Sequence, residues 1–316
     1  DPQTVDATTV ALTDASGAAV PADRSYDETT FTVTVDPTVV LAYSAEYTLT
    51  VSQLERASDG AVLAAPVTTV FKTQDPPPLV VVATSPSGGA DDVGLLIRAP
   101  AGPNGTSSFD VVVTFSEPVR TASLVLGSSF QLAPSDAQAS LVDGTLSWDV
   151  TETILTFTVD PADNYELSQE YRLYLSAAIE SQRATPEGGQ IGTPVVNLFK
   201  TLDPPALGLI AASPTGQGDN VALDPVEVTL FFSEPVDGNS VDDTTIFVNE
   251  GLTSDLGTSL ATTVTVDGTD PRLVHLAFDM LALPLKYTQQ YTVTIEDTVQ
   301  SVIATAEGGQ VGITLL

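Results

Sequence analysis

The pentapeptide Phe115-Ser116-Glu117-Pro118-Val119 recurs as Phe232-Ser233-Glu234-Pro235-Val236, and this repeat decides how the chain divides. The two copies are 232 − 115 = 117 residues apart, which is close to the size of one small β-sandwich module. Apolar residues alternate with polar ones before each copy, which is the two-residue period of a strand with one buried face. The predicted inward side chains are Val111, Val113 and Phe115 in one copy and Val228, Leu230 and Phe232 in the other.

A second signature occurs three times, as Tyr-Ser-Ala-Glu-Tyr at 43–47, Leu-Ser-Gln-Glu-Tyr at 167–171 and Tyr-Thr-Gln-Gln-Tyr at 287–291. Alternating apolar residues follow each copy, so each is expected to open a strand. Its place resembles the tyrosine corner of Greek-key sandwiches. The tripeptide Phe-Lys-Thr closes two modules, at 71–73 and 199–201, and Asp-Pro-Pro follows one residue later. These linkers place module ends near residues 75 and 203.

The remaining pattern is also that of strands. Alternation predicts that Phe31, Val33 and Val35 point inward in the first module, as do Leu155, Phe157 and Val159 in the second. Helices are expected only as short turns, because no long stretch has a period of 3.6 residues between a cap and a stop. The predicted fold class is therefore all-β: tandem Ig-like Greek-key β-sandwiches in an extended rod, stiffened by proline-rich linkers.

The repeats predict three modules of unequal completeness. Residues 1–75 are expected to lack their first strands, residues 76–203 to be complete with a loop inserted at 98–107, and residues 204–316 to lack their last strand. Two explanations stay open. The chain is a window of a longer repeat protein, or neighbouring copies supply the missing strands in a fibre, since an unpaired sheet edge is a template for strand addition.

The order of these motifs resembles the bacterial Ig-like domain family of the S-layer protein type. The resemblance rests on Ser85-Pro86, the FSEPV strand, the tyrosine-opened strand and the closing Phe-Lys-Thr, and it covers nearly the whole chain. One departure is the turn Glu187-Gly188-Gly189-Gln190, where members of the family often carry Asp-x-x-Gly-Asn. The resemblance implies surface-exposed spacer modules of S-layers, adhesins and secreted multidomain enzymes, in an extracellular or cell-surface location on bacteria.

Charge excludes some partners. Ten Lys and Arg residues against 41 Asp and Glu give a net charge of −31, and binding nucleic acid or anionic lipid needs basic groups that displace counterions. No run of 18 apolar residues is present for membrane insertion. The chain has no cysteine, so packed cores must hold each module in place of disulfides.

Calcium is the cofactor that this acidic chain favours, because the ion takes six to eight oxygen ligands. In an Ig-like topology the end of the FSEPV strand and the Glu-Gly-Gly-Gln turn return to the pole where the linker enters. Asp75, Glu117 and Glu187 are therefore the candidate ligands at one junction. Asp203, Glu234 and Glu307 are the candidates at the next. The alternative is that each Asp caps a turn and each Glu is solvated.

No catalytic centre is predicted, and the chain is expected not to be an enzyme. His275 is the only histidine, and the strand pattern turns it outward. Lys72 and Lys200 hold equivalent places on closing strands, where a lysine either guards a strand edge or forms a crosslink. Trp148 and an outward Phe231 are the best aromatic candidates for contact with surface glycans or proteins.

Three functions remain. The first is a structural extracellular repeat protein, a stalk, surface-layer or fibre component, whose partners are copies of itself or neighbouring modules and which polymerises by strand complementation in the fibre case. The second is an adhesin or carbohydrate-binding module that uses the 98–107 insertion. The third is a set of accessory domains of a secreted enzyme.

Overall fold

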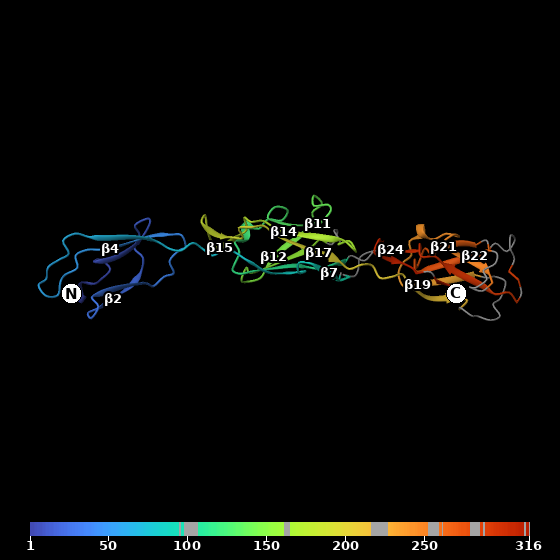
Figure 1. Cartoon of the computed structure of the whole chain (residues 1–316), viewed down its shortest axis with the longest axis horizontal. Helices are drawn as coiled ribbons and strands as arrows, with labels where there is room; N and C mark the ends of the chain where they lie inside the picture. Colours follow the sequence, from blue (N-terminus) through green and yellow to red (C-terminus); the bar gives the residue numbers. More distant parts are fainter. Residues whose placement is uncertain are drawn as a thin grey trace.

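Three β-rich bodies follow one another along the long axis of the molecule, in sequence order (Figure 1). We call them the first, middle and third modules, with joints in the two proline linkers. The structure is a computed structural model. It describes residues 1–94, 96–97, 107–160, 165–215, 227–251, 259–260, 262–278, 285–286, 288–312 and 314–315.

The middle module is a sandwich of two four-stranded sheets, with strand orders β12-β13-β10-β6 and β11-β14-β17-β7. Among the described strands of these two sheets, β7 alone pairs in parallel, with β17. The strands of the two sheets are β6 (Val81–Ser85), β7 (Ala90–Val93), β10 (Val111–Phe115), β11 (Phe130–Pro134), β12 (Gly144–Trp148), β13 (Ile154–Val159), β14 (Glu170–Leu175) and β17 (Val195–Thr201). A hairpin of β15 (Glu180–Thr185) and β16 (Gly188–Gln190) projects toward the first module (Figure 1).

The 98–107 insertion largely lies outside the described residues. Its flanks pair as β8 (Leu96–Ile97) with β9 (Ser107–Ser108).

The third module repeats this plan. Its sheets are β18-β19-β22-β21 and β20-β23-β26, and β24 and β25 form its hairpin. The strands are β18 (Leu209–Ser213), β19 (Glu227–Phe232), β20 (Ile246–Glu250), β21 (Thr262–Val266), β22 (Leu273–Phe278), β23 (Tyr291–Ile295), β24 (Gln300–Thr305), β25 (Gly308–Gln310) and β26 (Thr314–Leu315).

The first module has fewer strands among its fully described residues. One sheet has the order β1-β4-β5 and the other is the pair β2-β3. The strands are β1 (Val10–Asp14), β2 (Ala22–Asp27), β3 (Thr32–Pro37), β4 (Glu46–Val51) and β5 (Val67–Lys72).

The all-β prediction is confirmed, because helix in the described residues is limited to short 3₁₀ turns: η1 (Pro2–Thr4), η2 (Thr121–Ser123) and η3 (Gly238–Ser240). The predicted inward faces of β10, β13 and β19 are confirmed as well. Val111, Leu155, Phe157 and Leu230 are completely buried.

One inward residue was predicted wrongly. Phe31 is 79% exposed and lies in the turn before β3 at a φ of 56°. The turn is shaped by Asp27, whose Oδ1 accepts hydrogen bonds from the amides of Thr29 (2.8 Å) and Thr30 (3.4 Å), so the strand begins one residue later than the alternation suggests. Val33 and Val35 are half-buried.

The packing explains why FSEPV recurs. Ser116 donates its amide to Val80 O at 2.9 Å, and its Oγ accepts from the Val80 amide at 3.0 Å, which holds the start of β6 against the end of β10. Ser233 makes the same pair of bonds with Gly208, at 2.8 and 2.9 Å. The valine that ends each copy is buried and bridges to the hairpin strand, as Val119 does with Ser181. The motif therefore connects the end of β10 to the start of β6, which follows the linker, and to the β15–β16 hairpin.

Candidate functional site at the module junctions

The first and middle modules each have a tyrosine corner next to the junction that follows them. The hydroxyl of Tyr47 accepts a hydrogen bond from the Ala42 amide at 3.0 Å, and that of Tyr171 accepts one from the Glu166 amide at 2.8 Å. These bonds hold the tight turn before β4 and β14, in which Ser44 and Ser168 have φ values of 50° and 56°. The corner thereby presents a serine hydroxyl toward the next module.

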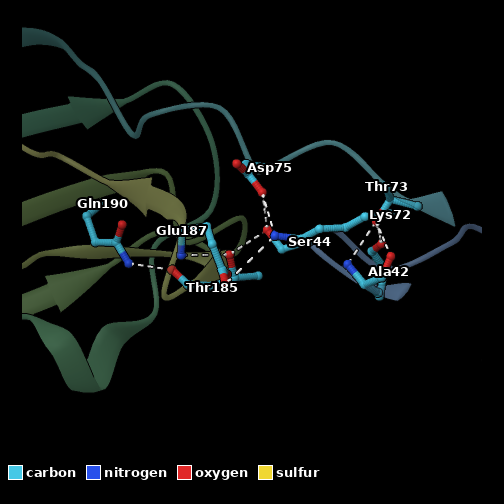
Figure 2. A network of polar contacts seen from close by, with 9 residues as sticks. Ala42, Ser44, Lys72, Thr73, Asp75, Thr185, Glu187 and Gln190 are labelled. Atoms are coloured by element: carbon cyan, nitrogen blue, oxygen red, sulfur yellow. Dashed lines mark hydrogen bonds and ion pairs between the residues drawn. The ribbon is translucent and has the colours of Figure 1, made fainter. Parts of the chain in front are cut away.

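At the first junction the hydroxyl of Ser44 bridges the two modules. Ser44 Oγ donates to Asp75 Oδ1 in the linker at 2.8 Å and lies 2.9 Å from Oγ1 of Thr185, at the tip of the β15–β16 hairpin (Figure 2). Thr185 Oγ1 also accepts the amide of Glu187 at 3.3 Å. Two side chains 141 residues apart in sequence thus form a direct contact between modules. We call this pair of hydroxyls the latch.

The second junction has the same latch. Ser168 Oγ lies 2.7 Å from Thr305 Oγ1, at the tip of the β24–β25 hairpin. Thr305 Oγ1 accepts the Glu307 amide at 3.3 Å, as its counterpart does in the middle module. The two joints are therefore built from equivalent residues.

Backbone contacts fix the linkers to the hairpins. The amide of Leu79 donates to Gln190 O at 3.1 Å, and the amide of Leu207 donates to Gln310 O at 3.1 Å. Gly188 lies so close to the first linker that a Cβ at this position would stand 2.5 Å from Pro76 O, and Gly308 lies against Pro204 O in the same way. The hairpin turn needs glycine there because no larger residue fits beside the linker carbonyl.

A lysine neutralises the acids of each junction. Lys72 Nζ lies 3.6 Å from Asp75 Oδ1 and 3.9 Å from Glu187 Oε1 (Figure 2). Of the three acids predicted as calcium ligands at this junction, Glu117 goes elsewhere: its Oε2 lies 3.6 Å from Nε of Arg183. Two of the predicted ligands are thus brought together, around a cation that the protein itself supplies.

At the second junction Lys200 Nζ lies 3.0 Å from Asp203 Oδ1. The Lys200 ammonium, followed by the Ser168 hydroxyl, lowers the pKa of Asp203, and Asp203 in turn raises the pKa of Lys200, with a smaller contribution from Glu307. Glu234 acts on Arg272 instead: Asp270 is the main cause of the raised pKa of Arg272, and the charge of Glu234 makes a smaller contribution.

Among the described residues, no three His, Asp or Glu side chains converge on a point that could hold a metal ion. Calcium binding at Asp75, Glu117 and Glu187 or at Asp203, Glu234 and Glu307 stays a prediction.

Sequence reasoning did not identify the latch. The signal was present: Ser44 and Ser168 are the second residues of the tyrosine signatures, and Thr185 and Thr305 precede the two Glu-Gly-Gly-Gln turns by the same interval. What the sequence does not state is that these two turns meet.

The other candidate residues have ordinary local partners. His275 is half-buried on the outer face of β22, with Nδ1 2.7 Å from Glu227 Oε1 and Nε2 3.4 Å from Asp267 Oδ2. Trp148 packs against the core with its ring 6.0 Å from that of Phe115, so it is not a free surface aromatic. The Arg272 guanidinium covers Phe231 at 4.9 Å from the ring centre.

A family model described as the bacterial Ig-like domain matches residues 75–196 and 203–310. The chain belongs to the bacterial Ig-like domain family. The two matches cover the middle and third modules and meet at the second linker. The resemblance noted in the sequence is thereby confirmed, and the latch of the second junction is a contact between two tandem bacterial Ig-like domains.

Solved structures similar to these Ig-like domains have low identity. A crystal structure of domains from titin is 10% identical with a TM-score of 0.33, and the match covers 97% of this chain and 87% of that one. The N-terminal part of the bacterial S-layer protein SbsC is 13% identical with a TM-score of 0.26, covering 76% and 43%. An LD transpeptidase in complex with imipenem is 14% identical with a TM-score of 0.23, covering 76% and 87%. At these TM-scores the three likenesses carry no argument about function.

A search of curated proteins found no match to this sequence. Within the described part of the chain, no helix has the length and hydrophobicity that crossing a bilayer requires.

Proposed function

We propose that the chain is an extracellular spacer of a bacterial cell surface, a stalk, surface-layer or fibre component that holds another part of an assembly at a distance. The observation that carries this proposal is the repeated joint. At both junctions the same serine–threonine latch, glycine–proline contact and lysine–aspartate pair restrain one module on the next. Restrained joints keep the two ends of a chain at a set distance from each other, which a flexible linker does not do.

Membership of the bacterial Ig-like domain family supports this role at the general level of a repeat module outside the cell. The acidic surface supports it as well. A net charge of −31 keeps an extended chain soluble and discourages contact with anionic lipid and nucleic acid.

The proposal gives the chain no catalytic role. The single histidine is held between Glu227 and Asp267 on the outer face of β22, with the Thr229 hydroxyl 3.5 Å from Nδ1.

The test anchors one end of the chain to a surface, fuses a fluorescent protein to the other end, and measures the height of the fluorophore. A spacer predicts a height that is unchanged when residues 98–107 are deleted and that falls when the latch serines are replaced in Ser44→Ala and Ser168→Ala. The proposal is contradicted if Ser44→Ala and Ser168→Ala leave the height unchanged while deletion of residues 98–107 abolishes saturable binding to a glycan or protein. That result would indicate an adhesin.

A further inference from the structure

One sheet face of the middle module is apolar where the solvated face of an antiparallel sheet is ordinarily polar. β14 and β17 pair so that Arg172 lies beside Leu198 and Tyr174 lies beside Val196. The residues that alternate with these four are buried, so the four side chains point outward. Val196 is 51% exposed and Leu198 is 41% exposed. Exposed apolar side chains that adjoin one another mark an interaction surface.

The other two modules have threonine at the strand positions that carry this surface. In the middle module the first and third residues after the corner tyrosine are Arg172 and Tyr174. Both positions are threonine in the first and third modules: Thr48, Thr50, Thr292 and Thr294. Threonine suits an ordinary strand face, so the fold does not require arginine and tyrosine here. These two residue types are, however, enriched at the centres of protein interfaces.

The charged groups of this face have no ion-pair partners of their own. The Arg172 guanidinium lies over the ring of Tyr174, 4.9 Å from its centre. Glu170 is exposed two residues earlier on the same face of β14, and its cross-strand neighbour Lys200 pairs with Asp203 instead. Among the described residues, neither Arg172 nor Glu170 takes part in an ion pair. The face thus presents one positive and one negative group along a single strand.

We propose that this face joins two copies of the chain, whose middle modules pack face to face around a two-fold axis at right angles to β14. The axis passes between Glu170 and Arg172, so that Arg172 of each copy faces Glu170 of the other. A two-fold contact must be self-complementary, and these two residues supply opposite charges at equal distances from the axis. Tyr174, Val196 and Leu198 supply the apolar area around the two ion pairs.

A second copy is the occupant that the charges of this face favour. Two chains of net charge −31 repel each other over most of their surface. The repulsion is weak here, because residues 190–199 contain no charged residue and the charges of Glu170 and Arg172 cancel. A basic partner would be attracted to the carboxylates elsewhere on the chain, and an acidic partner would place a like charge opposite Glu170. A second copy pairs both groups.

This contact goes beyond the spacer role, because a single chain can hold a distance without it. One sheet face of a small module is at the low end of specific interfaces, below about 1,200 Å² in total. We therefore expect a weak dimer, with a Kd on the order of 0.1 mM. Such a dimer is populated where chains are concentrated.

The experiment measures self-association of the whole 316-residue chain by sedimentation velocity. Protein concentrations run from about 10 μM to about 1 mM, on both sides of the expected Kd. Arg172→Glu and Glu170→Arg each place like charges across the axis, and each should weaken self-association at least about tenfold. An equimolar mixture of the two variants should form a heterodimer about as tight as the wild-type dimer, because each contact again joins opposite charges. A variant that merely misfolds would not recover in the mixture.

A substitution in the apolar part of the face complements the charge exchange. Leu198→Thr keeps strand propensity but removes apolar area, and it should weaken the dimer about threefold or more. Ile154→Thr is the matched control, since Ile154 is 38% exposed on β13 in the opposite sheet, and it should leave the dimer unchanged.

Three outcomes overturn the proposal: a wild-type chain that stays monomeric at about 1 mM, a dimer that the charge substitutions leave unchanged, or a mixture of the two charge variants that does not associate. Assemblies larger than a dimer that ignore these substitutions would indicate strand addition at a sheet edge instead.

Discussion

Ser44 Oγ lies 2.9 Å from Thr185 Oγ1 and 2.8 Å from Asp75 Oδ1, so one hydroxyl joins the corner of the first module, the linker and the hairpin of the middle module. The same relationship recurs between Ser168 and Thr305 at 2.7 Å. Because the same contact forms at both joints, it is a regular feature of the repeated modules and not a peculiarity of one loop.

The glycine beside the linker should be intolerant of a side chain. Gly188→Ala places a methyl group 2.5 Å from Pro76 O, so hairpin and linker must separate. We expect a loss of about 1–3 kcal/mol, the usual cost of overpacking, measured by chemical denaturation. The amide of Leu79, bonded to Gln190 O, should exchange faster.

Gly94→Ala is the matched control in the same module, because among the described residues no atom beyond its chain neighbours lies within 4 Å of a Cβ at that position. Its effect should stay within about 0.5 kcal/mol. Equal effects of the two substitutions would contradict the contact between hairpin and linker.

The tyrosine corner should stabilise the middle module through its hydroxyl. Tyr171→Phe keeps the buried ring but leaves the Glu166 amide without its 2.8 Å acceptor. Because this bond is part-buried, we expect a loss of about 1 kcal/mol, the usual net contribution of a hydrogen bond. Tyr174→Phe is the control, since the half-exposed Tyr174 ring stays under the Arg172 guanidinium, at 4.9 Å, in both forms. Equal shifts of the denaturation midpoint in Tyr171→Phe and Tyr174→Phe would contradict a stabilising role for the hydroxyl of the tyrosine corner.

Asp149 should make the middle module sensitive to acid. Hydrogen bonds from the Thr151 hydroxyl and then the Ile154 amide lower the pKa of Asp149 to about 2, from 3.8. A depressed folded-state pKa contributes stability above the unfolded-state value, and this contribution is lost as the pH falls from about 4 to about 2. Asp149→Asn should therefore destabilise the module at pH 7, and the difference from wild type should shrink across that window.

The measurement is thermal unfolding of both proteins at pH 7, 4, 3 and 2. The difference between them isolates Asp149 from the general effect of protonating a chain with 41 acidic residues. A difference that stays constant down to pH 2 would show that the charge of Asp149 does not stabilise the turn.

Lys72 should compete with any divalent cation at the first junction. Its ammonium lies 3.6 Å from Asp75 Oδ1 and 3.9 Å from Glu187 Oε1, so Lys72→Gln removes the cation that both carboxylates approach. We expect the variant to bind Ca²⁺ more tightly than wild type by calorimetry. The gain should be about tenfold or less, because the group is solvent-exposed. Lys286→Gln, paired with Glu250 away from this junction, is the control. Identical titrations of all three proteins would contradict the competition.

The repeats in the sequence were sufficient to predict strands and modules of this class. Alternation identified the buried faces of β10, β13 and β19 because each is a long run with one face in a core. It failed at Phe31, because an apolar residue in a turn continues the same alternation and only the hydrogen bonds of Asp27 show where the strand begins.

The junction was harder to predict. Topology led to the expectation that Asp75 and Glu187 approach one pole, and the structure places both near Lys72. Neither the lysine at their centre nor the latch follows from periodicity, because a strand pattern states only that Lys72 faces solvent. Contacts between modules depend on how far each hairpin extends toward the neighbouring module, and the periodicity of a strand does not specify that.

The central claim is that the latch restrains the joints. The chain contains no cysteine, so the double variant Glu28→Cys, Ala139→Cys can be spin-labelled at two exposed positions, one in each of the first two modules. Pulsed electron paramagnetic resonance then measures the distribution of distances between them. The account predicts one narrow peak, which broadens when Ser44→Ala and Thr185→Val are added and stays narrow when Ser147→Ala is added as a control. A distribution that is already broad with the latch intact, and that the latch substitutions leave unchanged, would contradict it.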